Sequence, residues 1–194
     1  AVIATGSKRR AFQLLKLRPD LQIINIRGNV DTRLRKMEEQ QLDGIVLAAA
    51  GLKRLGMEDV ITQYLAPEDM ISAPAQGALA LEVREDQKEL QKMLDVFCDE
   101  ETMNEVCAER NFLEQMGGSC HTPAGARCQK TDQGYELYAM FGNEDGSKQA
   151  YTKVYGTCPE ILAQTAVKNI KKQLAGIVYL IGAGPGDPGL ITVK

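Results

Sequence analysis

The order of apolar and amphipathic segments in the first third of the chain constrains its fold more than any other feature. Short apolar runs at 2–4, 22–26 and 44–48 alternate with amphipathic stretches at 8–16 and 30–41. This βαβαβ order indicates a mostly parallel sheet with helices on its faces. Ligands of such sheets bind where strand ends meet helix starts, so the residues at those junctions are the first candidates for a functional site.

Both strand-to-helix junctions carry polar caps and basic side chains. Thr5-Gly6-Ser7 precedes the first helix and Arg27-Gly28-Asn29 precedes the second, and both offer capping side chains and backbone N–H groups that suit an anion. Arg9 and Arg10 begin the first helix, and Arg33 lies in the second. Arginine forks bind carboxylates in pairs, so the two junctions together could bind a polyanion. The alternative is a solvated helix face with surface ion pairs, and spacing alone leaves both open.

The rest of the chain predicts a second, smaller unit. Proline and glycine break the middle of the chain, and an alternating apolar pattern then predicts a return strand over 78–83. Two helices, an antiparallel meander and a closing helix follow, which together indicate a small α+β domain with a three-stranded antiparallel sheet. The expected helices span 88–97, 101–116 and 159–174, and the expected strands span 124–129, 135–141 and 149–156.

Composition and cysteine spacing exclude several classes of function. With 23 basic and 26 acidic residues and a net charge of −3, no overall field favours nucleic acid. The longest apolar run, 45–50, is too short to span a bilayer, and the N-terminus lacks the pattern of a signal peptide, so a cytoplasmic protein without a membrane partner is expected. The five cysteines form no C-x-x-C pair, which argues against a disulfide framework and a metal site.

Cys120 differs from the other cysteines because it lies in a glycine-containing stretch, 117–123, that joins a helix to the sheet. A thiol in such a stretch can reach a ligand. His121 is a poor activating base, because adjacent side chains in extended backbone point to opposite sides. The spacing leaves open whether Cys120 is reactive or an ordinary loop cysteine.

Five motifs taken together resemble the porphobilinogen deaminase (hydroxymethylbilane synthase) family, in the family's order and over roughly residues 1–175. The motifs are Thr5-Gly6-Ser7-Lys8-Arg9-Arg10, Ile26-Arg27-Gly28-Asn29-Val30-Asp31-Thr32-Arg33-Leu34, Leu47-Ala48-Ala49-Ala50-Gly51-Leu52-Lys53-Arg54-Leu55-Gly56, Ala75-Gln76-Gly77-Ala78, and Gly118-Ser119-Cys120 before Thr122-Pro123.

This resemblance implies an enzyme with a covalently held cofactor. The family tethers a dipyrromethane through a thioether to the loop cysteine, here Cys120, and adds four porphobilinogen units head to tail with loss of ammonia. Porphobilinogen and its oligopyrrole chain are therefore the implied partners. Their acetate and propionate groups explain why an acidic protein would build an arginine-lined cleft. The residues that align with the family's cofactor contacts are Thr5, Ser7, Arg9, Arg10, Arg27, Gly28, Arg33, Arg54 and Gln76.

The resemblance also implies a domain plan. Residues 1–72 correspond to an α/β cofactor-binding domain with a sheet like that of periplasmic binding proteins, and 73–87 to a hinge and return strand. Residues 88–175 correspond to the α+β domain that carries the cysteine. The chain is expected to begin inside the second domain and to lack the first, with its proton-handling aspartate, so no catalytic residue and no turnover by this chain alone are predicted. Two departures from the family's pattern are Ser119 and Ala75, where glycine is common.

Residues 176–194 change in character, to an apolar run followed by a glycine-rich loop at 182–189. They resemble the opening of uroporphyrinogen-III C-methyltransferase, whose loop contacts S-adenosylmethionine. A fusion protein is therefore expected, with a downstream methyltransferase domain that lies outside the chain and no methyl-donor binding by the chain itself.

Two alternatives remain for the function of the whole chain: a non-catalytic anion-binding module of the periplasmic-binding-protein type, and a methyltransferase throughout.

Overall fold

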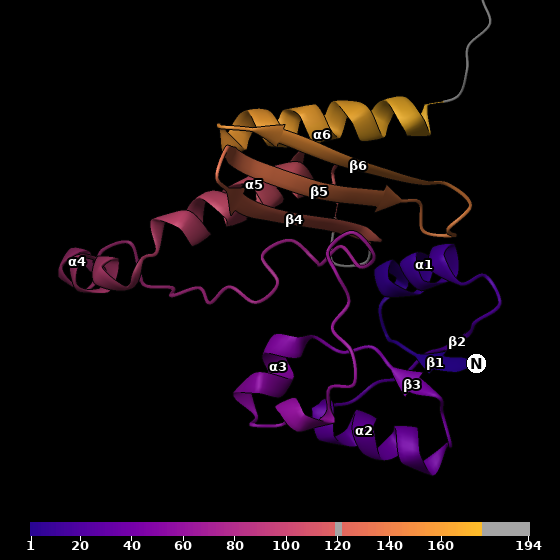
Figure 1. The fold of residues 1–194 in the computed structure, drawn as a ribbon. Helices are drawn as coiled ribbons and strands as arrows, with labels where there is room; N and C mark the ends of the chain where they lie inside the picture. Colours follow the sequence, from indigo (N-terminus) through magenta and orange to yellow (C-terminus); the bar gives the residue numbers. More distant parts are fainter. Residues whose placement is uncertain (119–121, 176–194) are drawn as a thin grey trace, which may run out of the picture.

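The structure, a computed structural model that describes residues 1–118 and 122–175, contains two sheets of different kinds (Figure 1). One is a parallel sheet with the strand order β2-β1-β3, and the other is an antiparallel sheet with the order β4-β5-β6. The expected mixed α/β architecture, with a three-stranded antiparallel sheet in its second half, is confirmed.

The first sheet and its helices form a parallel-sheet unit over residues 2–60. Ala4 at the end of β1 pairs with Ile24 of β2 and with Ile45 of β3, so the carboxyl ends of all three strands meet at one edge. Ser7 caps α1 and Asn29 caps α2 through side-chain oxygens, as their positions predict. The elements are β1 Val2–Ala4, α1 Lys8–Leu17, β2 Gln22–Ile24, α2 Val30–Glu39, β3 Gly44–Ile45, α3 Ala49–Arg54 and a 3-10 turn Glu58–Val60.

The second sheet packs one face against two helices to form an antiparallel unit over residues 100–174. Along the central strand, Leu137 and Ala139 face a buried cluster that includes Phe112 of α5 and Ile170 of α6. Tyr138 and Met140 alternate with them and contact Ile71 on the opposite face. The elements are α5 Glu100–Gln115, β4 Ala124–Thr131, β5 Gly134–Gly142, β6 Gln149–Gly156 and α6 Pro159–Leu174.

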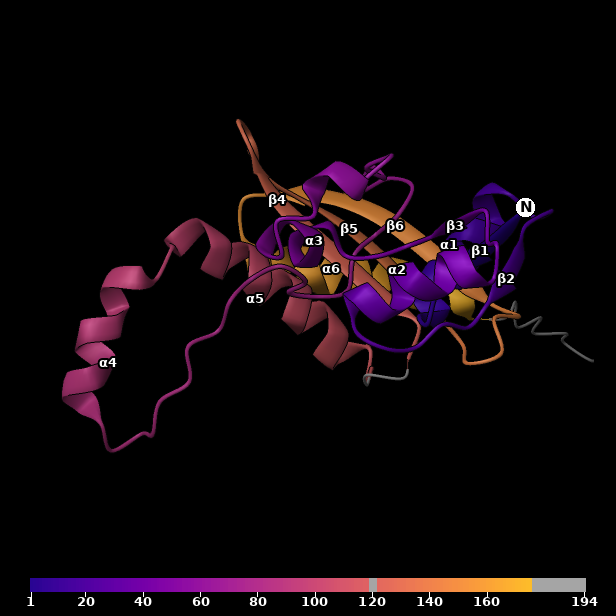
Figure 2. The ribbon, with the colours of Figure 1, turned by 90° about the horizontal axis from the view of Figure 1, so that it is seen from below.

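The parallel-sheet unit and the segment that follows it dock on the antiparallel sheet, on the face away from α6 (Figures 1 and 2). The Ala126 amide donates to the Ser72 carbonyl at 3.0 Å, and the Tyr138 hydroxyl donates to Glu68 at 2.5 Å. The Lys16 ammonium of α1 lies 3.5 Å from the centre of the Tyr151 ring. These contacts join α1 and the segment after the parallel-sheet unit to the antiparallel sheet.

The return strand predicted over 78–83 is not formed. Leu79 is 79% exposed and Leu81 is 63% exposed, and this stretch leads to α4 (Lys88–Leu94) and a 3-10 turn (Asp95–Phe97) that extend away from both units (Figure 2). A strand needs a neighbour to take its backbone hydrogen bonds, and no strand of the described residues lies beside this stretch. Within the same residues, no helix has the length and apolar character needed to cross a membrane.

Candidate anion-binding cleft

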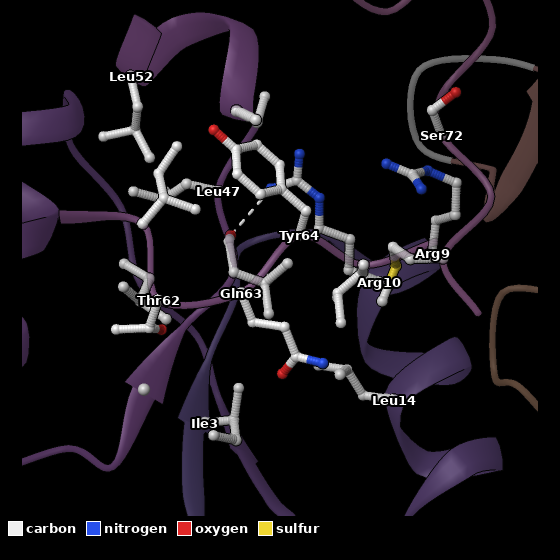
Figure 3. Close-up of a pocket in the computed structure, with 18 of the residues that line it drawn as sticks. Ile3, Arg9, Arg10, Leu14, Leu47, Leu52, Thr62, Gln63, Tyr64 and Ser72 are labelled. Atoms are coloured by element: carbon white, nitrogen blue, oxygen red, sulfur yellow. Dashed lines mark hydrogen bonds between the residues drawn. The ribbon is translucent and has the colours of Figure 1, made fainter. Parts of the chain in front are cut away.

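A cavity of about 700 Å³ lies along α1 and β3 in the parallel-sheet unit (Figure 3). In that view, the apolar Leu52 of α3 and Ile3 of β1 lie on the left, and Arg9, Arg10 and Ser72 lie on the right. We call this cavity the arginine cleft. Its volume falls within the range of small-molecule sites, and the combination of apolar walls with a few charged groups is typical of them.

Arg9 is a buried arginine in the wall of the arginine cleft. Its Nη1 donates to the Ile71 carbonyl, and its Nη2 donates to Oε1 of Gln76 at 3.3 Å. Burial, followed by the charge of Arg10, lowers the pKa of Arg9 to about 10. Gln13, one turn later on α1, accepts from the Ile71 amide at 2.8 Å, so the segment beside Arg9 is held from two side chains. The geometry fixes the guanidinium in one direction.

Arg10 lies beside a second arginine rather than beside an acid. Its Nη1 donates to the Val46 carbonyl at 3.0 Å, at the end of β3. Burial lowers the pKa of Arg10, and the positive charge of Arg33 lowers it further. The Nε of Arg33 in turn donates to the Gly28 carbonyl at 2.7 Å. The charge of Arg33 at the second strand-to-helix junction therefore acts on Arg10 at the first.

Thr5 and Ser7 shape the turn between β1 and α1. The Thr5 hydroxyl accepts from the Ser7 amide at 3.2 Å, and the Ser7 hydroxyl accepts from the Arg10 amide at 3.4 Å. The first turn of α1 contains no acidic residue, although the positive end of the helix dipole favours acids there. A helix start that carries two arginines and no acid is suited to an external anion.

The predicted arginines lack acidic partners. Across residues 1–118 and 122–175, no ion pair joins Arg9, Arg10, Arg27, Arg33 or Arg54 to a carboxylate, whereas the exposed Arg18 and Arg35 both have one. Two of the unpaired arginines, Arg9 and Arg10, are also the ones whose pKa burial lowers. Buried positive charge without a counter-charge is costly, and a bound carboxylate would compensate for it.

The structure brings only part of the predicted site into one cavity. Arg9, Arg10 and Gln76 line the arginine cleft, and Arg33 adds its charge beside Arg10. The remaining predicted residues that the structure describes lie around it and do not line it: Thr5, Ser7, Arg27, Gly28 and Arg54. Arg27 is exposed, and Arg54 donates to the Gly77 carbonyl at 3.0 Å. Cys120, the predicted attachment point, lies outside the described residues.

Sequence reasoning missed several residues of the cleft. Gln63 and Tyr64 line it from the segment after the 3-10 turn, and Arg127 of β4 lines it from the antiparallel unit. No local motif marks Gln63 or Arg127. Gln13 does not line the cleft but holds Ile71 beside Arg9. It had a usable signal, because it lies four residues after Arg9 and therefore on the same face of α1.

The conformation of Gly28, just before α2, requires glycine at the second strand-to-helix junction. Its φ is +128°, and a Cβ there would fall 2.8 Å from Cγ2 of Thr32. We expect Gly28→Ala to lower the free energy of unfolding by about 1–3 kcal/mol, because both the backbone region and the space suit only glycine. Urea denaturation measures this change. The matched control is Gly51→Ala in α3, where a Cβ meets nothing within 4 Å and stability should rise by up to about 1 kcal/mol. Equal stabilities of the two variants would contradict the prediction.

Comparison with known protein families matches most of the chain. Residues 1–92 match the model of the porphobilinogen deaminase dipyromethane cofactor binding domain, and residues 103–175 match that of the porphobilinogen deaminase C-terminal domain. The arginine cleft thus lies mainly in the first matched region.

Three bacterial porphobilinogen deaminases illustrate the similarity. The chain is 49% identical to that of Lachnospira eligens over 171 residues, which are 87% of this chain and 58% of the relative. It is 42% identical to that of Clostridioides difficile over 175 residues, 89% of this chain and 58% of the relative. It is 46% identical to that of Bacillus cereus over 175 residues, 89% of this chain and 57% of the relative. The chain therefore spans a little over half the length of these relatives, and it belongs to the porphobilinogen deaminase family.

Proposed function

We propose that this chain is the cofactor- and substrate-holding part of an enzyme that joins porphobilinogen units into hydroxymethylbilane. The observation that carries the proposal is the set of arginines without acidic partners, of which Arg9 and Arg10 line the arginine cleft. Porphobilinogen and the dipyrromethane cofactor carry acetate and propionate on each ring, and carboxylates are the natural partners of arginine forks. The relatives that match the chain are named porphobilinogen deaminase, so the alternative of a non-catalytic anion-binding module is not favoured.

The residues present fit a dipyrromethane. Bound there, the cofactor supplies the pyrrole to which further porphobilinogen units are joined with loss of ammonia. Arg9 and Arg10 hold and orient its carboxylates from the cleft, and the charge of Arg33 adds to the attraction. Thr5, Ser7 and the backbone at Gly28 keep the two helix starts in place. Arg27, Arg54 and Gln76 are the further contacts that the family alignment suggests, and Cys120 is the proposed thioether attachment.

The finer organisation of the parent protein stays a prediction. We infer a sheet of the periplasmic-binding-protein type for residues 1–72, with domain limits near 72 and 88. The family models match 1–92 and 103–175 and leave 176–194 unmatched, so the likeness of that stretch to a methyltransferase rests on its sequence alone. The inactivity expected of the chain by itself is likewise a prediction for assay.

Mass spectrometry of the full-length parent enzyme, after incubation with porphobilinogen, tests the proposed attachment, because this chain by itself is expected to be inactive. We expect an added dipyrromethane on Cys120 and none on the Cys120→Ser variant, because the thioether requires the sulfur. Cys158→Ser is the matched control and should keep the adduct, because Cys158 belongs to the N-terminus of α6. Calorimetric titration with porphobilinogen accompanies the test. No adduct at Cys120 together with no binding of porphobilinogen would contradict the proposed function.

A further inference from the structure

A tight turn connects the arginine cleft to the antiparallel unit. We call residues 73–77 the clamp turn; it closes through a hydrogen bond from the Gln76 amide to the Ala73 carbonyl at 3.0 Å. Ala75 within it has a φ of +60°, the left-handed region that favours glycine. An alanine in this conformation persists only where its surroundings hold it there.

Glu109 of α5 holds the clamp turn from the antiparallel unit. Its side chain is 3% exposed. One oxygen, Oε2, accepts from the Ala75 amide at 2.6 Å, and the other, Oε1, accepts from the Cys128 amide of β4 at 2.8 Å. Arg127 lies 3.9 Å from Oε1. The carboxylate thus bridges the turn and the sheet, which are far apart in the sequence.

The parallel-sheet unit holds the opposite side of the same turn. Oε1 of Gln76 accepts from Nη2 of Arg9 at 3.3 Å, and Nη2 of Arg54 donates to the Gly77 carbonyl at 3.0 Å. Two adjacent residues of one turn therefore connect Glu109 to Arg9. The Ala75 amide donates to the Glu109 carboxylate, and the Gln76 side chain accepts from the Arg9 guanidinium.

We propose that Glu109 is a positioning residue for the arginine cleft. Its carboxylate keeps Ala75 in the left-handed conformation, which keeps the Gln76 amide oxygen against Arg9 and so sets the direction of the Arg9 guanidinium. The role toward carboxylate ligands rests on the proposed function, whereas the clamp itself is a property of the chain.

The raised pKa of Glu109 makes its hydrogen bond to the clamp turn depend on pH. Burial is the main cause that raises the pKa of Glu109 to about 6; Glu105 raises it further, while Arg127 and the two backbone hydrogen bonds act in the opposite direction. The neighbouring Cys128 thiol has a pKa raised to about 12, chiefly by burial, and does not titrate in the same range. Protonation removes the negative charge that both oxygens share, so the hydrogen bonds from the Ala75 and Cys128 amides weaken as the pH falls through about 6.

Amide NMR of the whole chain tests the clamp without any ligand. We expect the Ala75 and Cys128 amide protons to move upfield with a midpoint near pH 6 in the wild type, because they lose a charged acceptor, and to lose this titration in Glu109→Gln. Glu105→Gln is the matched control: Glu105 lies one turn earlier on α5 and also accepts a backbone amide of β4, from Lys130 at 2.9 Å, but does not bond the clamp turn. The Ala75 titration should persist in this control.

Calorimetry with porphobilinogen tests the effect on the cleft. We expect Glu109→Gln to weaken binding by about tenfold, the value of one charge-assisted contact, and Glu105→Gln to change it less than twofold. Adding Ala75→Gly to Glu109→Gln should restore most of the affinity, because glycine adopts the left-handed turn without help.

The outcomes separate the two proposals. Wild-type affinity in Glu109→Gln, an equal loss in Glu105→Gln, or no recovery with Ala75→Gly would each overturn the positioning role. An Ala75 amide that does not titrate in the wild type would overturn the clamp. If the wild type does not bind porphobilinogen, the proposed function fails, while the NMR result still decides the clamp.

Discussion

Arg10→Met should weaken the binding of porphobilinogen about 10- to 100-fold and leave the stability of the chain unchanged or slightly higher. The loss follows from removing a charge-assisted partner for a carboxylate, which contributes about 1.5–3 kcal/mol. The stability result follows from the surroundings of Arg10, because burial and the charge of Arg33 both oppose its ionised form. Titration calorimetry and urea denaturation of the same preparation measure the two effects.

The matched control for Arg10 is Arg35→Met in α2. Arg35 is exposed and pairs with Glu39 one helical turn away, so its loss should change binding less than twofold and stability by under about 0.5 kcal/mol. If Arg10→Met destabilised the chain as much as it weakened binding, Arg10 would be a structural residue and the anion site would lie elsewhere.

Phe112→Ala should lower the free energy of unfolding by about 3–5 kcal/mol, the largest effect that we expect from one substitution. Phe112 is fully buried in the cluster between α5, α6 and the antiparallel sheet. Removing its ring loses the burial of a large apolar surface and leaves a cavity that close-packed neighbours fill only in part. Denaturant unfolding followed by circular dichroism measures the change.

Phe97→Ala makes the same chemical change at a site that is 75% exposed, in the 3-10 turn after α4. It should alter stability by no more than about 0.5 kcal/mol. A similar loss in both variants would show that the residues around α4 are packed in solution, and would contradict the exposed course that this segment takes in Figure 2.

The sequence predicted those elements whose signals are local. Ser7, Asn29 and Asp99 each cap a helix within a few residues of the expected start, because an N-cap acts over three residues. The three antiparallel strands were predicted because period-two patterns and turn residues are short-range signals. The stretch 78–83 has the same period, but a strand also requires a partner, and pattern alone does not supply one.

Only those residues of the candidate site that belong to a sequence motif could be predicted. The motifs contain Arg9, Arg10 and Gln76, which the structure places along one cavity. Glu109 was not predicted, because its partner Ala75 lies 34 positions away in the sequence and an isolated glutamate in a helix looks like a solvated one. The left-handed φ of Ala75 was not predicted either, although the glycine that the family commonly has at this position is the residue that such a conformation favours.

The clamp turn has a consequence for how the chain unfolds. Its conformation depends on Glu109 from one unit and on Arg9 and Arg54 from the other, so the two units cannot separate without releasing Ala75. Undocking of the units and loss of order at the arginine cleft are then a single cooperative event. The backbone amides around the arginine cleft should therefore be protected from hydrogen exchange about as well as those of the antiparallel unit. The small core of the parallel-sheet unit would protect them less if that unit opened by itself.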